Sequence, residues 1–152
     1  MKILYIDPEI HTPNSRIYEH YNYLFDQVAQ KAECFVYRGT QFDSILTPLN
    51  TARAAGFEPD VIFFGMGWFA LPEIVFSKNL QTRDIDIPCV GFLYKPQNFL
   101  DKKIEFLKSN NFDLVVTSVP AAYPIETFPE PPATLASELP TETKELEPIA
   151  VL

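Results

Sequence analysis

Glycine is scarce in this chain: there are five glycines in 152 residues, and none of them precedes Gly39. The glycine-rich loop that follows the first strand of a dinucleotide-binding domain is therefore missing, which argues against an NAD or FAD site at that place. Histidine is also scarce, with His11 and His20 alone. No metal-binding spacing and no Ser-His-Asp order is present, so neither a metal nor a cofactor is predicted.

The chain has two cysteines, Cys34 and Cys89, and both lie inside apolar runs. Their spacing matches no zinc or redox motif, so we expect them to be small buried hydrophobic residues. No apolar run approaches the ~20 residues that span a bilayer. No basic segment followed by an apolar one precedes the first strand, so no secretory signal is recognised. These features predict a cytoplasmic protein without a membrane span.

Positive charge is in deficit, because 12 Lys and Arg residues face 20 Asp and Glu residues, for a net charge of -8. This balance argues against binding to nucleic acid or to an anionic membrane surface. Residues 120–152 alone hold six glutamates, one lysine and seven of the fourteen prolines. We therefore expect one folded domain over residues 1–120, followed by an extended or disordered acidic tail over residues 121–152. Within it, residues 121–129 carry Tyr123, Ile125 and Phe128, which is compatible with an irregular segment at a sheet edge.

Five short apolar runs are the positive signal, and they occupy residues 2–7, 33–38, 60–65, 88–94 and 112–117. Four of them are apolar at nearly every position, as parallel strands covered on both faces require. The segments between them predict helices over residues 15–32, 41–56, 71–80 and 98–109, with a break near Pro48. The pattern predicts a Rossmann-like three-layer α/β/α sandwich with a five-stranded parallel sheet, in the strand order 3-2-1-4-5.

Right-handed crossovers bring every loop that follows a strand to the same edge of the sheet, where ligands of open α/β sheets bind. The loop after the first strand is the most polar in the chain, and His11, Asn14 and Arg16 are its candidate ligand-binding residues. Backbone amides at a helix start, with an arginine beside them, can hold an anion or a sugar hydroxyl. The structural alternative is that Asn14 caps the helix and His11 is solvated.

The loop after the third strand supplies Gly65, Gly67 and Trp68 as further candidates. Two glycines permit a close approach of the backbone to a ligand. The single tryptophan of the chain suits a planar ring or the face of a sugar. The structural alternative is that Trp68 and Phe69 cover the sheet edge as part of the core.

The remaining candidates follow the fourth and fifth strands. Tyr94, Lys95 and Asn98 place a phenol, a cation and an amide after the fourth strand, and Ser118 follows the fifth. A lysine at a strand end faces the predicted cleft, whereas Asn98 has a second explanation as the N-cap of the following helix.

Four segments carry a resemblance to a known family: Met1 to Asp7, Glu58 to Ile62, Ile87 to Phe92, and Asn111 to Ser118. Their order over residues 1–125 resembles the N-terminal domain of GT-B glycosyltransferases of the group 1, family-4-like kind. The resemblance implies an acceptor-side domain. In that family a C-terminal domain holds the nucleotide-sugar, and transfer occurs between the two domains. It therefore implies a sugar acceptor or a nucleotide-sugar-related molecule as ligand, and a second Rossmann domain, in trans or missing from this sequence, for catalysis.

Two alternatives come from other classes. Residues 60–65 and 87–96 also resemble a response-regulator receiver domain. A receiver needs a phosphorylatable aspartate where this chain has Gly65, and it needs an acid pair of which Asp7 alone remains. Phosphorylation with Mg²⁺ is therefore excluded, which leaves a pseudo-receiver that binds a protein. The third reading is a flavodoxin-like flavin binder, with residues 12–15 as its phosphate loop and Trp68 stacked on the flavin.

Overall fold

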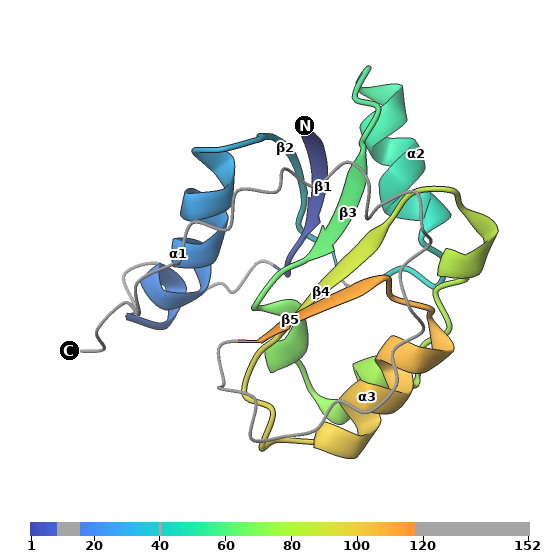
Figure 1. The fold of residues 1–152 in the computed structure, drawn as a ribbon. Helices are drawn as coiled ribbons and strands as arrows, with labels where there is room; N and C mark the ends of the chain where they lie inside the picture. Colours follow the sequence, from blue (N-terminus) through green and yellow to red (C-terminus); the bar gives the residue numbers. More distant parts are fainter. Residues whose placement is uncertain (9–15, 40, 118–152) are drawn as a thin grey trace, which may run out of the picture.

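The computed structural model describes residues 1–8, 16–39 and 41–117, and for residues 16–21 it describes the backbone alone. Figure 1 shows the arrangement of the elements. The strands are β1 Lys2–Ile6, β2 Glu33–Tyr37, β3 Val61–Phe64, β4 Cys89–Leu93 and β5 Leu114–Thr117. The α-helices are α1 Arg16–Ala29, α2 Leu46–Ala54 and α3 Leu100–Ser109, and the 3₁₀ helices are η1 Trp68–Ala70, η2 Glu73–Ser77 and η3 Thr82–Asp84.

The five strands form one sheet in the order β2-β1-β3-β4-β5, and every neighbouring pair is parallel. The predicted α/β class with a five-stranded parallel sheet is confirmed. Compared with the order 3-2-1-4-5, the pairs β1–β2 and β4–β5 are the same, and β3 lies between β1 and β4. Burial explains this place, because Ile62 and Phe64 of β3 are fully buried whereas Glu33 and Leu114 of the edge strands are exposed.

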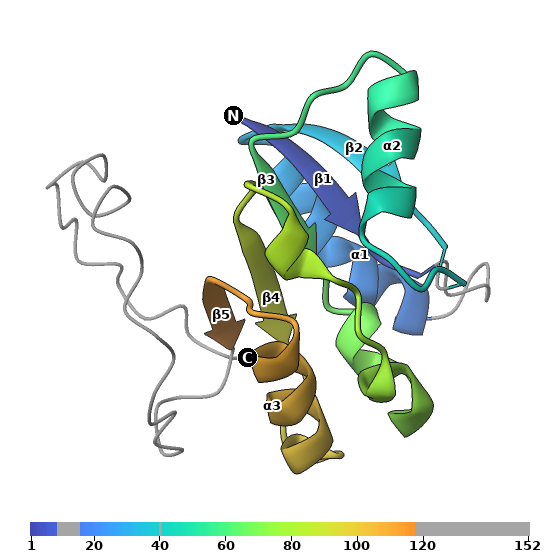
Figure 2. The same ribbon diagram turned by 90° about the vertical axis from the view of Figure 1, so that its right-hand side faces the viewer.

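Three layers make up the domain. Figure 2 shows the sheet between α1 on one side and α2 and α3 on the other, and the 3₁₀ helices lie on the side of α2 and α3. Right-handed crossovers explain this division, because the β1–β2 connection runs in the opposite direction along the sheet to the other three. The main core lies between the sheet and α2, η1–η3 and α3, and it includes Leu4, Ile6, Phe64 and Phe106.

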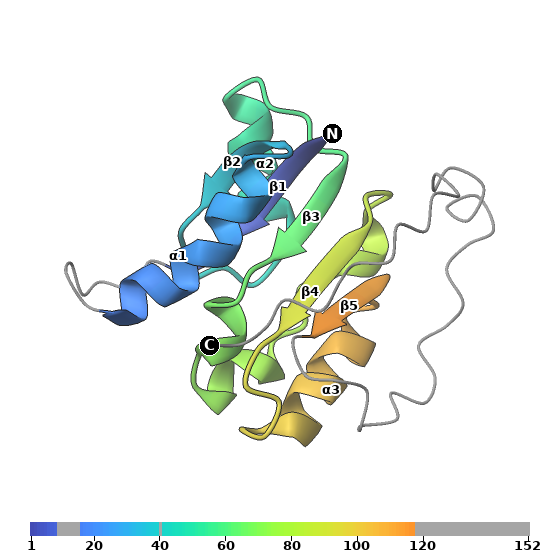
Figure 3. The same ribbon diagram turned by 60° about the vertical axis from the view of Figure 1, so that its left-hand side comes forward.

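The face that carries α1 is covered less completely. Figure 3 looks onto this face, where α1 lies over β1 and β2, and no helix of the described residues lies over β4 and β5. Tyr5 packs here with its ring centroid 5.1 Å from that of Phe25 and 5.3 Å from that of Phe63. Among the described residues, no helix combines the length and the apolar character needed to cross a membrane.

The connection between β3 and β4 differs from the prediction. The helix expected over residues 71–80 is absent, and three separate 3₁₀ turns take its place. Pro72 precedes η2 in extended backbone, with a ψ of 154°, so a helix cannot run through it. The buried side chain of Asn110 holds this irregular path, accepting a hydrogen bond from the Leu80 N–H (2.5 Å) and donating one to the Lys78 carbonyl (3.0 Å).

The helix predicted over residues 41–56 is shorter and shows no break. It begins at Leu46, so Pro48 falls in the first turn of α2, where backbone N–H groups have no partner within the helix. A proline costs little at such a position, and the kink expected near Pro48 is corrected to a helix that starts just before it.

Candidate functional site

Among the described strands, the sheet has one topological switch point, between β1 and β3. The chain leaves β1 towards β2 and leaves β3 towards β4, so the two connections diverge beyond the carboxyl ends of these strands. Ligands of open α/β sheets bind in that place. Asp7 follows β1 and Gly65 follows β3, and hydrogen bonds join the strand ends. The Gly65 N–H donates to the Ile6 carbonyl (2.9 Å), and the Asp7 N–H donates to the Tyr37 carbonyl (3.1 Å).

Asp7 carries the most perturbed carboxyl group described in the structure. The residue is 7% exposed, and burial raises the pKa of its side chain to about 7. Backbone N–H groups of Trp68 and Gly67 and the charge of Arg38 oppose this rise, since they favour the carboxylate. The Oδ1 atom has no hydrogen-bond partner among the described residues. The group therefore exchanges its proton near neutral pH, and one of its two oxygens is buried without a hydrogen-bond partner among the described residues.

A second buried oxygen lies beside Asp7. Tyr5 is fully buried, and its hydroxyl lacks a partner in the described part of the chain. Burial, followed by the negative charge of Asp7, raises the pKa of Tyr5, so the phenol stays neutral and can both donate and accept. A Cβ atom placed on Gly65 would lie 2.6 Å from Asp7 Oδ2 and 2.6 Å from the Tyr5 hydroxyl. Only glycine leaves room for both oxygens at this strand end.

Trp68 contributes its backbone and not its ring. The side chain is fully buried, with its ring centroid 5.1 Å from that of Phe64, 5.4 Å from Phe42 and 6.2 Å from Phe106. The ring has no open face for a sugar or a flavin, so the expected aromatic platform is corrected to a core role. The physical reason is that η1 turns the chain back towards α2 and α3 immediately after Gly67. Gly67 and Trp68 reach the site through the N–H groups that favour the Asp7 carboxylate.

The loop after β4 borders the site on its β4 side, since β4 neighbours β3. Lys95 is exposed and adopts a left-handed backbone with a φ of 45°, and its Nζ lies 5.2 Å from the centroid of the Tyr94 ring. Buried Lys103 of α3 holds the loop, because its Nζ donates to the Tyr94 carbonyl (2.8 Å) and to the Lys95 carbonyl (2.9 Å). Burial, and then the charge of Lys95, lower the pKa of Lys103 to about 8. Lys95 thus stands at the rim on a fixed backbone.

Asn98 does not cap α3. Phe99 occupies the N-cap position with a left-handed φ of 56°, and no side chain makes a cap hydrogen bond. Asn98 is exposed, and its N–H donates to the Lys95 carbonyl (3.0 Å), which closes the turn instead. A residue that closes a turn through its backbone leaves its side chain free for solvent, so the expected cap is corrected.

The structure describes some of the predicted site residues and leaves others outside its described ranges. Gly65, Gly67, Tyr94 and Lys95 follow the neighbouring strands β3 and β4, as expected. His11, Asn14 and Ser118 lie outside the described residues, and Arg16 begins α1 with a side chain that is not described. Tyr5 and Arg38 were missed as site residues, and Asp7 was noted as the remaining acid of a receiver-like pair but not as a ligand-binding candidate. Their position at the ends of β1 and β2 is the signal that would have identified them.

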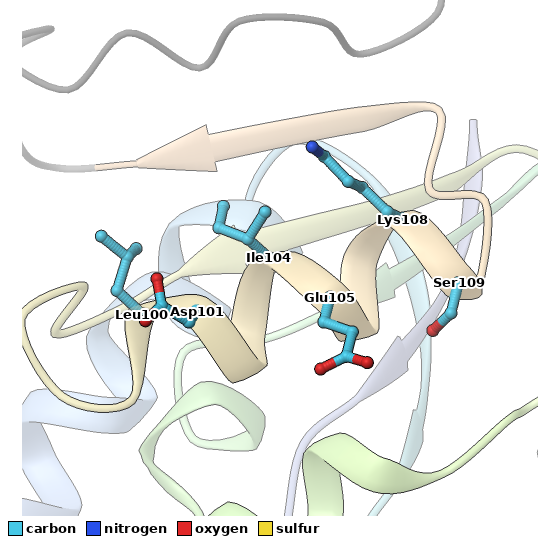
Figure 4. A pocket seen from close by; sticks show the side chains of 6 residues that line it. All are labelled: Leu100, Asp101, Ile104, Glu105, Lys108 and Ser109. Carbon is cyan, nitrogen blue, oxygen red and sulfur yellow. The ribbon is translucent and has the colours of Figure 1, made fainter.

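A separate groove of about 580 Å³ follows the outer side of α3 (Figure 4). Its described walls belong to that helix alone: Leu100, Asp101, Ile104, Glu105, Lys108 and Ser109. None of the strand-end residues lines it, so it does not extend the switch-point site. Within the described ranges, no cluster of three or more His, Cys, Asp or Glu side chains is arranged to share a metal ion.

Comparison with known proteins adds no relative. No family model matches the chain, and neither a curated protein nor a solved structure matches it. Any function must therefore be argued from the residues of the switch point itself.

Proposed function

We propose that this chain is a ligand-binding domain of the acceptor-side GT-B kind, which holds a hydroxyl-rich ligand at the β1/β3 switch point and needs a second domain to transfer sugar. One observation carries the proposal. Two buried oxygens, Asp7 Oδ1 and the Tyr5 hydroxyl, lack partners in the described structure beside the glycine that separates β3 from its loop. Buried polar groups are nearly always paired, so a ligand hydroxyl would supply the partner that these two oxygens lack. The buried Trp68 Nε1 also lacks a partner in the described structure, and its ring lies within the core.

The chemistry of the two oxygens suits a sugar hydroxyl. The Asp7 carboxylate accepts hydrogen bonds, and the Tyr5 hydroxyl both donates and accepts, which together match the dual character of an alcohol group. Gly65 adds no side chain that would compete for the space. Lys95 at the rim can meet an anionic part of the same ligand, such as a phosphate.

The pKa of Asp7 matches a role in proton transfer. A carboxyl group with a pKa of about 7 is a base suited to neutral pH, because it is partly deprotonated there and still basic enough to attract a proton. In an acceptor-side domain such a group would take the proton from the attacking hydroxyl. The donor sugar would come from the second domain that the family resemblance implies.

Amide NMR spectra of the ¹⁵N-labelled full chain test this proposal. UDP-glucose, GDP-mannose, glucose and maltose are added separately, and shifts are expected at residues 7, 38 and 65–68 with at least one of them. Asp7→Asn keeps the shape and removes the charge, so we expect about tenfold weaker binding or more. Asp101→Asn on the exposed side of α3 is the matched control and should bind as the wild type does.

Two results would contradict the proposal. One is that none of the four probes moves these amides at saturating concentration. The other is that Asp7→Asn binds as tightly as the wild type and the Asp101→Asn control.

The strand order favours a second candidate function, a pseudo-receiver that binds a protein. The order β2-β1-β3-β4-β5 is that of flavodoxin-like domains. A pseudo-receiver with this order would bind a protein and leave the four sugar probes without effect. A flavin binder would take up FMN and turn yellow, whereas the buried ring of Trp68 leaves no surface on which the flavin could stack.

A further inference from the structure

One face of the sheet is apolar beyond the helix that covers it. Because the β2–β3, β3–β4 and β4–β5 connections all use the opposite face, α1 is the single described helix on this one, and Figure 3 shows β4 and β5 clear of it. The register places Val61, Phe63, Val90, Leu114 and Val116 side by side across β3, β4 and β5 on this face.

These side chains form a groove of about 460 Å³ between α1 and the three strands. Leu114 is 55% exposed and Val116 is 38% exposed. The described lining is apolar apart from Gln27 and Lys31, and its other members are Met1, Ile3, Val28, Ala32, Val61, Phe63, Val90, Leu114 and Val116. A strand that faced water permanently would alternate apolar with polar residues. The outward residues of β5 are instead a leucine and a valine, so this face is built to be covered.

We infer that residues 119–128 of this same chain cover the groove, lying as an extended segment over β5, β4 and β3. Residues 119–128 follow Thr117, the last residue of β5, after a single residue, and β5 is the edge strand beside the groove. Strands in a sheet are about 4.8 Å apart, so the groove floor from β5 to β3 measures about 10 Å. Ten extended residues reach about 33 Å, which is ample.

The composition of residues 119–128 fits the groove. Val119, Tyr123, Ile125 and Phe128 supply apolar side chains, and no aromatic residue follows Phe128. Pro120 and Pro124 disfavour a helix and cannot donate a backbone N–H, so they suit an extended segment that packs on a face.

The charged residues of the segment and of the groove also support residues 119–128 as the occupant. Glu126 is the one charged residue of this segment, and Lys31 is the one charged residue among the described lining of the groove. Their opposite signs complement each other. This inference is independent of the proposed ligand site, because no residue of the switch point lines the groove.

Hydrogen exchange of the full chain, measured by mass spectrometry, tests the inference. The triple variant Tyr123→Ser/Ile125→Ser/Phe128→Ser removes the apolar cover, and we expect amides of β5 to exchange about tenfold faster or more. Amides of β1, which has a paired strand on each side, should stay protected, which shows that the variant still folds. The matched control, Leu135→Ser/Leu139→Ser/Ile149→Ser, removes three apolar residues further along and should leave β5 unchanged.

Light scattering on the same samples measures the oligomeric state, and so tests whether a second copy of the chain occupies the groove instead. A monomeric wild type with the expected exchange pattern supports the inference. A dimer that dissociates on dilution, with faster β5 exchange in the monomer, would assign the groove to a second copy and overturn it. β5 exchange within twofold of wild type in the triple variant, or the same acceleration in the control variant, would overturn it as well.

Discussion

Asp7 is the residue of the candidate site whose charge changes near neutral pH. It follows β1, it is almost fully buried, and its pKa lies at about 7 instead of 3.8. Two backbone N–H groups favour its charged form, and desolvation opposes that form more strongly. Strongly perturbed pKa values cluster at functional sites, which is why Asp7 is placed at the centre of the candidate site.

The raised pKa of Asp7 predicts a pH-dependent stability. Between about pH 4 and pH 7 the unfolded chain has lost this proton while the folded chain retains it, so rising pH favours unfolding. Asp7→Asn removes this term. We expect its free energy of unfolding, relative to wild type, to rise by about 3 kcal/mol from pH 4.5 to pH 8. Urea unfolding at the two pH values measures it. Asp101→Asn should show no such rise, and an equal rise there would refute the assignment.

At the scale of elements, the chain between β3 and α3 is held by side chains where regular secondary structure is missing. Asn110, fully buried at the end of α3, bonds to the Leu80 N–H, the Lys78 carbonyl and the Phe106 carbonyl, and its own carbonyl accepts from the Thr82 hydroxyl. Since 3₁₀ turns satisfy few backbone groups internally, this asparagine replaces the hydrogen bonds that a helix would have made.

Removing the Asn110 side chain is expected to destabilise the domain strongly. Asn110→Ala removes the acceptor of the buried Leu80 N–H together with the hydrogen bonds to the Lys78 and Phe106 carbonyls, which should cost about 3 kcal/mol of unfolding free energy. Urea unfolding followed by tryptophan fluorescence measures this loss. Asn79→Ala, at an exposed asparagine that accepts one bond from the Gln81 N–H (3.1 Å), should cost less than about 1 kcal/mol. Similar losses in the two variants would rule out this role.

A lysine of α3 holds the loop that follows β4, at the rim of the site. Lys103 belongs to α3, yet its Nζ bonds to the carbonyls of Tyr94 and Lys95 after β4, and it lies 5.7 Å from the centroid of the Phe76 ring. A buried lysine stays charged most easily when carbonyl oxygens and an aromatic face replace its water. The helix therefore determines the backbone of the loop that presents Lys95.

At the scale of the whole molecule, one aromatic core joins the sheet to η1, η2 and α3. Phe64, Trp68, Phe69, Phe76, Phe106 and Phe112 form a chain of ring contacts with centroids 5.0 to 6.3 Å apart. Such rings bury a large apolar area each, so they dominate the stabilisation of a domain of this size. Cys89, 1% exposed in β4, lies in the same core and reports on its integrity.

Thiol labelling distinguishes the two cysteines and measures opening of the whole core. Burial raises the pKa of Cys89 to about 12, so its thiolate is about one part in ten thousand at pH 8. In a Cys34→Ala variant, Ellman's reagent should label Cys89 at least about 100-fold more slowly than it labels Cys34 in a Cys89→Ala variant. In denaturing urea the two rates should converge. Fast labelling of native Cys89 would show that the core opens locally.

Much of the architecture could be predicted because it depends on local patterns. Continuous apolar runs identified all five parallel strands within about two residues, and the first, second and fourth helices began within about five residues of their predicted starts. The helix predicted over residues 71–80 was wrong, since an apolar periodicity does not reveal that Pro72 and Asn110 impose separate turns. The candidate site was predicted by position, through Gly65, Gly67 and Lys95, whereas the roles within it were not.

The sequence by itself determined that this protein is a parallel α/β domain with its polar loops gathered at one sheet edge, because hydrophobic periodicity and right-handed crossovers act without reference to distant residues. Only the tertiary structure decided that β3 lies beside β1, that the Trp68 ring belongs to the core, and that Asp7 and Tyr5 share the space above Gly65. Burial is the physical reason. A side chain's desolvation, and with it the pKa of Asp7, depends on neighbours that the chain brings together from strands far apart in sequence.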